Sequence, residues 1–391
     1  MWMEKFLDNY ILVELTDYCN YNCIMCCHDR PEGPHTSKKG FMDKNLFIKI
    51  INELPHMKAA CGLKLFWLGE PFLNPVFPEM FEECCKILKQ DKGNYYIDLH
   101  TNAAFLTPEI SELLIKNSDI VPRITLSLDA FSQQTYSKIR RGGNLHNVVE
   151  NIEYFLKLRA KYNKSRPGLI FQFIVMEENK HEAGDFGKFW IEKVNKYKNT
   201  SSGKIMEKLT KISGYSLGKK IGNTLKLEDT ADVVWYKRLD TSAEKLADAE
   251  KCYVETMKKF NLSSKIENNV EIIVSEFNLW NPEQQQKKSE EKKENRRRAC
   301  SGPWKTPAIK WDGTLTICCF DPSMELQIGN LNNNTFSELW FGDKINSIRK
   351  NHLNGDFDKV LTKDGYQKCL YCPGLDTPFL SDEEIKNYER N

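Results

Sequence analysis

The chain has 391 residues, of which 56 are basic and 54 acidic, and its formal net charge is +2. This length allows one large domain and a smaller one with well-buried cores. The near balance of charge creates no overall field that would attract nucleic acid or an anionic membrane. We therefore expect neither as a partner.

The first 20 residues carry acidic side chains within their apolar run and lack a small-residue cleavage site. No other stretch approaches the length of apolar sequence that spans a membrane. We expect no signal peptide and no membrane span, and hence a reducing, cytoplasmic location. In that compartment the 13 cysteines favour metal binding or redox chemistry over a disulfide framework.

Short apolar runs alternate with amphipathic stretches, which is the pattern of repeated βα units around a parallel sheet. The expected strands are residues 10–15, 63–67, 95–101, 123–128, 169–175 and 231–237. The expected helices between them are residues 42–54, 77–89, 107–116 and 145–159. These units predict an α/β fold with a partial (β/α)6 TIM-like barrel, whose ligands lie at the carboxyl ends of the strands.

Two later stretches depart from this pattern. Residues 190–227 have the composition of helix and polar loop, and they are a candidate insertion. Residues 281–299 are a run of charges without apolar periodicity, which predicts a solvated linker. We therefore divide the chain into a core at residues 1–280, this linker, and a small domain at residues 300–391. In the small domain, Asp312-Gly313 between two short apolar runs predicts a β-hairpin.

Cys19, Cys23 and Cys26 follow the first expected strand with the spacing C-x3-C-x2-C. Three thiolates can hold three irons of a [4Fe–4S] cluster and leave the fourth iron to another ligand. The alternative is a zinc site completed by Cys27 or His28. Cys26 and Cys27 are sequential neighbours that would have to chelate one small ion, which favours the cluster.

The spacing resembles that of the radical S-adenosylmethionine (SAM) superfamily. In that family SAM chelates the open iron, and an electron from the cluster cleaves it to a 5′-deoxyadenosyl radical. The family usually has an aromatic residue just before the third cysteine, and here Met25 takes that position. Since Met can also pack against adenine, the resemblance implies that Met25 contacts SAM.

A second match lies at the end of the next expected strand. Gly69, Glu70 and Pro71 resemble the family's Gly-Gly-Glu-Pro motif, with Leu68 in place of the first glycine. In the family, the backbone of this motif and its Glu contact the amino group of SAM. The resemblance implies the same contacts here.

Further matches follow in family order on the later βα units. Ser127 and Asp129 belong to a strand that resembles the one touching the SAM ribose, and Arg140 or Arg141 resembles the arginine that pairs with the SAM carboxylate. His100 resembles a strand-end residue that faces the substrate. A structural hydrogen-bonding role and a catalytic role both remain open for this histidine.

The small domain carries two cysteine pairs, Cys300 with Cys318 and Cys369 with Cys372. Spacing alone favours zinc over a second iron–sulfur cluster. In this context, however, the pairs resemble the SPASM/Twitch extension of radical SAM enzymes, which houses auxiliary [4Fe–4S] clusters. Four ligands match the shorter Twitch form, with one fully coordinated cluster that carries electrons. The spacing is similar to that of the radical SAM dehydrogenase acting on the aminocyclitol 2-deoxy-scyllo-inosamine.

Two of the remaining cysteines have a further candidate role. Radical SAM epimerases use a cysteine thiol that is not a cluster ligand to return a hydrogen atom to the substrate radical. The resemblance makes Cys319 and Cys252 candidate hydrogen donors.

The resemblance as a whole implies a radical SAM oxidoreductase. Its deoxyadenosyl radical would abstract a hydrogen atom from a sugar- or cyclitol-like molecule, and the auxiliary cluster would accept the second electron. A reductase with flavodoxin, or ferredoxin, would supply the first electron. The short stretch before the first expected strand leaves no peptide-recognition domain there, which favours a small substrate. The alternatives are a peptide-modifying maturase or epimerase and, in another class, a non-catalytic zinc-binding structural protein.

Overall fold

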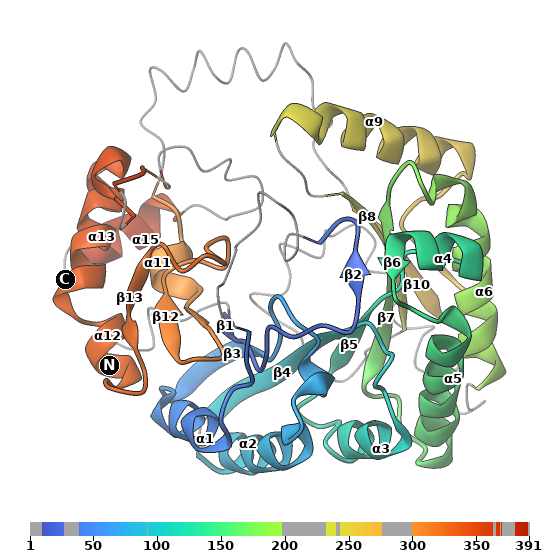
Figure 1. The fold of residues 1–391 in the computed structure, drawn as a ribbon, viewed down its shortest axis with the longest axis horizontal. Helices are drawn as coiled ribbons and strands as arrows, with labels where there is room; N and C mark the ends of the chain where they lie inside the picture. Colours follow the sequence, from blue (N-terminus) through green and yellow to red (C-terminus); the bar gives the residue numbers. More distant parts are fainter. Residues whose placement is uncertain are drawn as a thin grey trace.

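A computed structural model describes residues 10–26, 39–91, 93–197, 232–239, 243–275, 299–362, 365–367, 369 and 380–389. Figure 1 shows a curved sheet with helices along its outer side and the C-terminal elements at one end. Among the described residues, no helix is both long and apolar enough to cross a membrane.

Eleven of the described strands join into one sheet, in the order β13-β12-β11-β1-β3-β4-β5-β7-β8-β10-β9, and two short strands pair separately. Its middle is parallel and consists of β1 (Tyr10–Val13), β3 (Met57–Lys64), β4 (Gly93–Thr101), β5 (Arg123–Ser127), β7 (Gly168–Val175) and β8 (Val233–Arg238). Beyond β8 lie β10 (Val270–Val274), which is parallel to it, and β9 (Lys265–Glu267), which is antiparallel to β10. The expected partial barrel is confirmed.

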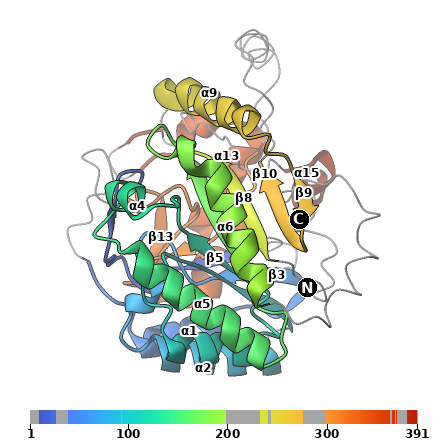
Figure 2. The same ribbon diagram turned by 90° about the vertical axis from the view of Figure 1, so that its right-hand side faces the viewer.

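The helices cover the outer side of this sheet in chain order (Figures 1 and 2). They are α1 (Lys44–Glu53), α2 (Phe77–Asp91), α3 (Pro108–Lys116), α4 (Gln133–Ile139), α5 (Leu145–Lys161), α6 (Ala183–Lys196) and α9 (Ala243–Lys259), with short 3-10 turns η2 (Pro71–Leu73) and η3 (Lys180–Glu182). Asp43 caps α1 by accepting the backbone N–H groups of Asn45 and Leu46, and Thr107 caps α3 in the same way. These caps explain why both helices begin where the sequence predicts.

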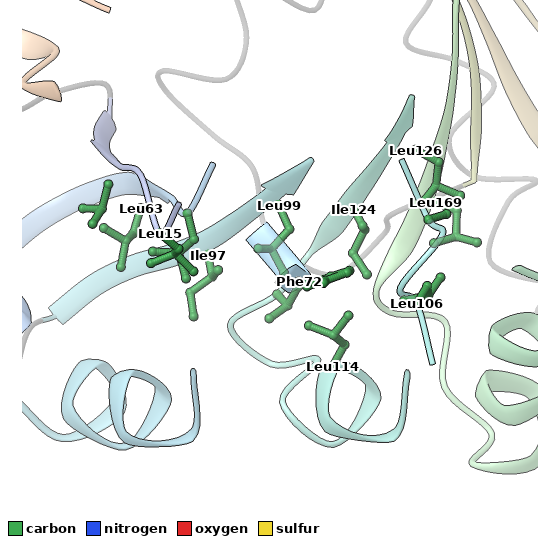
Figure 3. Close-up of a cluster of buried hydrophobic side chains, with 14 of the residues drawn as sticks. Leu15, Leu63, Phe72, Ile97, Leu99, Leu106, Leu114, Ile124, Leu126 and Leu169 are labelled. Carbon is green, nitrogen blue, oxygen red and sulfur yellow. The ribbon is translucent and has the colours of Figure 1, made fainter. Parts of the chain in front are cut away.

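The core lies between the sheet and these helices. Figure 3 shows Leu99 of β4 and Ile124 of β5 pointing towards Leu114 of α3, with Leu63 of β3 and Ile97 of β4 to one side, and all five side chains are buried. Alternate residues of each strand point to the opposite face, which we call the inner face. In contrast to the core, the inner face is polar and half-buried: it carries Lys64, Asp98, His100, Ser127, Trp235 and Lys237.

The C-terminal elements extend the same sheet. β11 (Ala308–Ile309) pairs in parallel with β1, and β12 (Thr314–Thr316) and β13 (Gln327–Asn330) follow antiparallel. The turn between β11 and β12 contains Gly313 at φ +83°, so the expected hairpin at Asp312-Gly313 is confirmed. The helices of this part are α11 (Gly302–Lys305), α12 (Phe336–Trp340), α13 (Asp343–Asn354) and α15 (Asp382–Glu389).

The structure departs from the expected elements at two places. β3 ends at Lys64, whereas the sequence predicted a strand over residues 63–67. The first residues of the candidate insertion belong to α6, because Trp190 is buried against the sheet and stacks on Phe171 with ring centroids 4.5 Å apart. Residues 198–227 of the candidate insertion and residues 281–298 of the predicted linker lie outside the described residues.

A buried ion pair joins α5 to the sheet. Both guanidinium Nη atoms of Arg159 lie 2.7 Å from the Asp232 carboxylate, which also accepts the backbone N–H of Leu169 at 2.8 Å.

We predict that Asp232→Ala destabilises the protein by about 3–5 kcal/mol, because it leaves a buried cation unpaired. The midpoint of urea unfolding, followed by circular dichroism, measures the loss. Glu83→Ala, which removes an exposed partner of Lys86, is the control. Equal midpoints for both variants would contradict this prediction.

Candidate active site

The three N-terminal cysteines lie on one short loop after β1. Cys23 belongs to β2 (Asn22–Cys23), which pairs antiparallel with β6 (Arg140–Arg141). Cys26 closes a turn by donating its backbone N–H to the carbonyl of Cys23 at 3.0 Å, and Met25 is half-buried within this turn. The loop is therefore attached to the segment that follows α4.

The three cysteines of this loop differ in exposure, since Cys19 is exposed and Cys23 and Cys26 are half-buried. Burial raises the pKa of Cys19 to about 12, and the charges of Cys23 and Cys26 raise it as well. A hydrogen bond from the backbone N–H of Tyr21 acts in the opposite direction. Burial also raises the pKa of Cys23, whereas Arg140 lowers it and donates Nη1 to the Cys23 sulfur at 3.6 Å. Within the described part of the chain, no three Cys, His, Asp or Glu side chains are grouped closely around one point as for a single metal ion. Three thiols within electrostatic reach of one another fit the soft, three-thiolate ligation of an iron–sulfur cluster.

The loop between β3 and α2 approaches the cysteine loop at Gly69. A Cβ atom on Gly69 would lie 2.3 Å from the carbonyl oxygen of Thr16 and 2.6 Å from that of Tyr18. The next residue, Glu70, donates its backbone N–H to the same Tyr18 carbonyl at 2.9 Å. Only glycine allows this close approach of two backbones, which explains the residue type.

The Glu70 side chain binds protein groups. Its carboxylate accepts the Thr101 hydroxyl at 2.7 Å, the Asn102 backbone N–H at 2.8 Å and the Phe72 N–H at 3.3 Å. Burial raises the pKa of Glu70 to about 7, although these hydrogen bonds lower it. The Glu70 carboxylate therefore binds groups of the loop after β3 and of the end of β4. The resemblance had implied that it contacts SAM. Pro71 is buried and begins η2.

Arg140 and Asp129 form a buried ion pair beside Cys23. Asp129 Oδ2 accepts Arg140 Nε at 2.9 Å and is also bonded by Nη2, while Oδ1 accepts the backbone N–H of Ile174 at 2.6 Å. Burial alone would lower the pKa of Arg140, but the charges of Asp129 and Cys23 raise it overall. Arg141 is exposed. Of the two arginines that the sequence left open, Arg140 lies beside the cysteine loop.

The inner face of the sheet lies next to these loops. Ser127 ends β5 on this face, half-buried and level with Gln172 of β7. His100 stacks on Phe66 with ring centroids 3.9 Å apart, and its Nε2 is 3.8 Å from Asp98 Oδ1. Burial lowers the pKa of His100 to about 4 against the effect of Asp98, and Lys64 and Lys237 lower it further. His100 is therefore a neutral hydrogen-bonding group at neutral pH.

The cysteines of the C-terminal part lie at the other end of the sheet. Cys300, Cys318 and Cys369 are half-buried, and Cys372 lies outside the described residues. Cys300 and Cys318 are within electrostatic reach of each other. Cys318 Sγ accepts the backbone N–H of Phe320 at 3.3 Å. Cys300 and Cys318 thus come together beside the hairpin.

Cys319 reaches the inner face. Its sulfur accepts the Tyr10 hydroxyl at 3.1 Å, and its carbonyl accepts Trp67 Nε1 at 3.1 Å. A hydrogen bond from Cys318 lowers the pKa of the Cys319 thiol. The other candidate hydrogen donor, Cys252, is 4% exposed on α9 within the hydrophobic core and interacts with Glu177. The structure thus brings Cys319, and not Cys252, to the inner face near Tyr10.

A buried carboxylate that the sequence analysis missed joins both cysteine-bearing parts. Glu14 is fully buried and accepts the backbone N–H groups of Leu68 at 3.2 Å and Trp311 at 3.5 Å. Asp17 is also buried and lies 4.0 Å from the buried Lys310 ammonium. The signal was present in the sequence, since Glu14 is a charged residue within the apolar run YILVEL.

The sequence was compared with models of known protein families. The radical SAM superfamily model matches residues 13–184, and the model of the SPASM iron–sulfur cluster-binding domain matches residues 300–373. The chain belongs to the radical SAM superfamily. As a radical SAM enzyme with a SPASM domain, it binds a [4Fe–4S] cluster together with SAM. Its C-terminal part is an iron–sulfur cluster-binding domain.

Individual relatives resemble parts of this radical SAM enzyme. The tungsten-containing aldehyde ferredoxin oxidoreductase cofactor-modifying protein of Pyrococcus furiosus is 25% identical over 184 residues, which are 46% of this chain and 48% of that protein. The GTP 3′,8-cyclase of Lactiplantibacillus plantarum is 29% identical over 168 residues, which are 41% of this chain and 47% of the cyclase. The chain thus spans about half the length of the curated relatives it matches.

A solved structure shares the whole fold. Streptococcus suis SuiB bound to its precursor peptide SuiA superposes with a TM-score of 0.54 at 13% identity, covering 99% of this chain and 74% of SuiB. At this identity the likeness shows the fold alone.

The close approach at Gly69 leads to a testable prediction. In Gly69→Ala the new methyl group must displace the cysteine loop, and we expect the Kd for SAM to rise by about ten-fold or more, as for a loss of 1.4 kcal/mol. Equilibrium dialysis of SAM against the reconstituted enzyme measures this. The neighbouring Leu68→Gly, which restores the family's glycine, is the control and retains SAM affinity. An unchanged Kd in Gly69→Ala would contradict the steric argument.

The buried Glu14 predicts a pH dependence of stability. Burial and the charge of Asp17 raise its pKa in the folded protein from 4.5 to about 7. The folded state therefore binds the Glu14 proton more tightly than the unfolded state does. As the pH rises from 4.5 to 7, the free energy of unfolding falls by about 3 kcal/mol. Glu14→Gln cannot ionise, so its unfolding midpoint falls less over this range. Urea unfolding of both proteins at several pH values is the measurement, and parallel curves would contradict the prediction.

Proposed function

We propose that this radical SAM enzyme is an oxidoreductase that removes hydrogen from a sugar- or cyclitol-like small molecule. When bound, the cofactors supply reductive cleavage of SAM to a 5′-deoxyadenosyl radical, hydrogen abstraction, and an auxiliary [4Fe–4S] cluster that takes up the second electron. The protein positions the substrate C–H bond and excludes water. A flavodoxin, with its reductase, or a ferredoxin is the proposed electron donor.

We assign the cluster ligands from thiol placement. Cys19, Cys23 and Cys26 hold the cluster that binds SAM, because they share one loop at the carboxyl end of β1. The auxiliary cluster is assigned to the four cysteines of the SPASM domain, Cys300, Cys318, Cys369 and Cys372. The proposed domains are residues 1–280 and 300–391, joined by the charged linker.

The SAM contacts are proposed from the side chains around the cysteine loop. The backbone at Gly69 and Glu70 lies against this loop and faces the SAM amino group, while Met25 packs near adenine and Ser127 faces the ribose. Arg140 carries a positive charge beside Cys23, with Asp129 fixing its orientation. We propose that Arg140 attracts the SAM carboxylate to this side of the cluster.

One observation carries the oxidoreductase proposal. The Tyr10 hydroxyl of β1 donates to the sulfur of Cys319 at 3.1 Å, and Cys319 directly follows Cys318. An auxiliary-cluster ligand is therefore next in sequence to a side chain on the inner face. A substrate bound on that face would lie close enough to the auxiliary cluster to give up its second electron.

The same observation favours a second candidate, an epimerase. In that reaction the thiol of Cys319 would donate a hydrogen atom to the substrate radical, which leaves the substrate at its original oxidation level. The thiyl radical left on Cys319 would return to the thiol by taking up one electron from the flavodoxin or ferredoxin donor and one proton from water. The inner-face position of Cys319 suits this role, and a peptide residue could be the substrate. A purely structural zinc protein is the third candidate, and the superfamily membership weighs against it.

Iron content and SAM cleavage together test the proposal. We expect about eight irons per chain after anaerobic reconstitution, as for two four-iron clusters, and 5′-deoxyadenosine after addition of SAM and a strong reductant. The triple variant Cys19→Ala, Cys23→Ala, Cys26→Ala should lose about four irons and all SAM cleavage. The double variant Cys300→Ala, Cys318→Ala should lose about four irons and keep SAM cleavage. Zinc in place of iron, with no deoxyadenosine, would refute the proposal.

Solvent deuterium separates the two catalytic candidates. The enzyme turns over its substrate in D2O. An oxidoreductase then yields a product with two hydrogens fewer than the substrate, whereas an epimerase yields an isomer that carries one deuterium from the exchanged Cys319 thiol. Cys319→Ala should abolish only the second outcome. Mass spectrometry of the product reads both.

A further inference from the structure

Lys64 on the inner face has no carboxylate partner among the residues that the structure describes. It is half-buried at the end of β3, and its ammonium lies 3.7 Å from the centroid of the Tyr10 ring. The register places Asp98 beside it on β4, yet the Asp98 carboxylate is the one that approaches His100, at 3.8 Å. Among the described residues no carboxylate lies within 4.0 Å of the Lys64 ammonium. The cation is held by an aromatic ring instead.

A second cation faces the same region from the opposite side. Lys237 of β8 pairs in register with Ile174 of β7. Gln172, two residues earlier on β7, pairs in register with Ser127 of β5. Lys64 and Lys237 both act on His100 through their charges. The two ammonium groups therefore flank His100 from β3 and β8.

The carboxylate nearest to these lysines in the described part of the chain is shared with other groups. Asp98 acts on His100 together with the two lysines, and it also acts on Arg123 of β5, as Glu271 and Asp232 do. Lys64, by contrast, has an aromatic ring and no carboxylate within 4.0 Å among the described residues. A half-buried charge without a close counter-charge is unfavourable, so an anionic ligand would stabilise Lys64.

Aromatic side chains surround the same cations. Phe66 lies almost parallel to His100, with an interplanar angle of 14°, and Trp67 donates its Nε1 to the Cys319 carbonyl. The Tyr10 ring lies under Lys64 and its hydroxyl touches Cys319. Flat rings beside a cation suit a ligand with a ring-shaped body and one charged group.

We propose that the inner face binds a substrate that carries a carboxylate or a phosphate, with Lys64 as its ionic contact. The inference rests on the proposed function, since it concerns the substrate of that same site. His100, neutral beside Lys64, serves as a hydrogen-bonding partner of the anion or of an adjacent hydroxyl. The ring body lies on the Tyr10 side, towards Cys319. Lys64 is thus a specificity-determining residue.

Three ligands with one ring and different charges test this inference. Glucose 6-phosphate, glucuronate and glucose are titrated into the reconstituted, SAM-loaded enzyme, and binding is measured by calorimetry at constant ionic strength. We expect one anionic sugar to bind about ten-fold or more tightly than glucose, as for a charge-assisted contact. The phosphate and carboxylate arms identify which anion the site takes.

Variants of Lys64 decide whether this residue is the anchor. Lys64→Gln should remove the preference for the anionic sugar, Lys64→Arg should retain it, and the exposed Lys86→Gln on α2 should behave as wild type. No preference in the wild type, or a preference that persists in Lys64→Gln, overturns the inference.

SAM cleavage without substrate is assayed on the same preparations. Deoxyadenosine formation with no anion preference refutes only the anion site. Absence of deoxyadenosine refutes the proposed function, whatever the sugars do.

Discussion

The contact between two backbones, at Gly69 and at the carbonyls of Thr16 and Tyr18, organises the site of this enzyme. The loops after β1 and β3 approach so closely that a single methyl group on Gly69 would lie 2.3 Å from a carbonyl oxygen. The Glu70 N–H donates into the same loop at 2.9 Å. Because the cysteine loop is held from this side and paired with β6 from the other, its thiols have a defined position before any cofactor binds.

Buried carboxylates accept backbone N–H groups that the sheet leaves without partners. Loops at the ends of parallel strands have backbone N–H groups without ladder partners, and these groups need acceptors. Glu14, Glu70 and Asp129 supply them: each is buried and accepts at least one backbone N–H from a neighbouring loop or strand. The desolvation of these charges is unfavourable, which is why burial raises the pKa of Glu14 and of Glu70. Stability and site geometry therefore depend on the same side chains.

The SPASM domain is joined to the barrel by a shared sheet. β11 pairs in parallel with β1, so the hairpin that carries Cys318 and Cys319 extends the row of barrel strands (Figure 1). Tyr10 then connects the two parts through its bond to Cys319. A continuous sheet holds Cys318 and Cys319 in a constant position relative to the inner face, as the proposed electron transfer from a bound substrate requires.

The sequence alone determined most of the elements and the family, because these are encoded locally: strand and helix periods by backbone geometry, and helix starts by caps at Asp43 and Thr107. It also predicted the cluster cysteines from their spacing. It also contained the alternation of Tyr96, Asp98 and His100 that marks a polar inner face. Only the tertiary structure decided that Arg140 lies beside Cys23, that Glu14 reaches Trp311, and that Lys64 lies over the Tyr10 ring. Such pairs are up to 309 residues apart, as Tyr10 and Cys319 are. They follow from strand order and register, which no local pattern specifies.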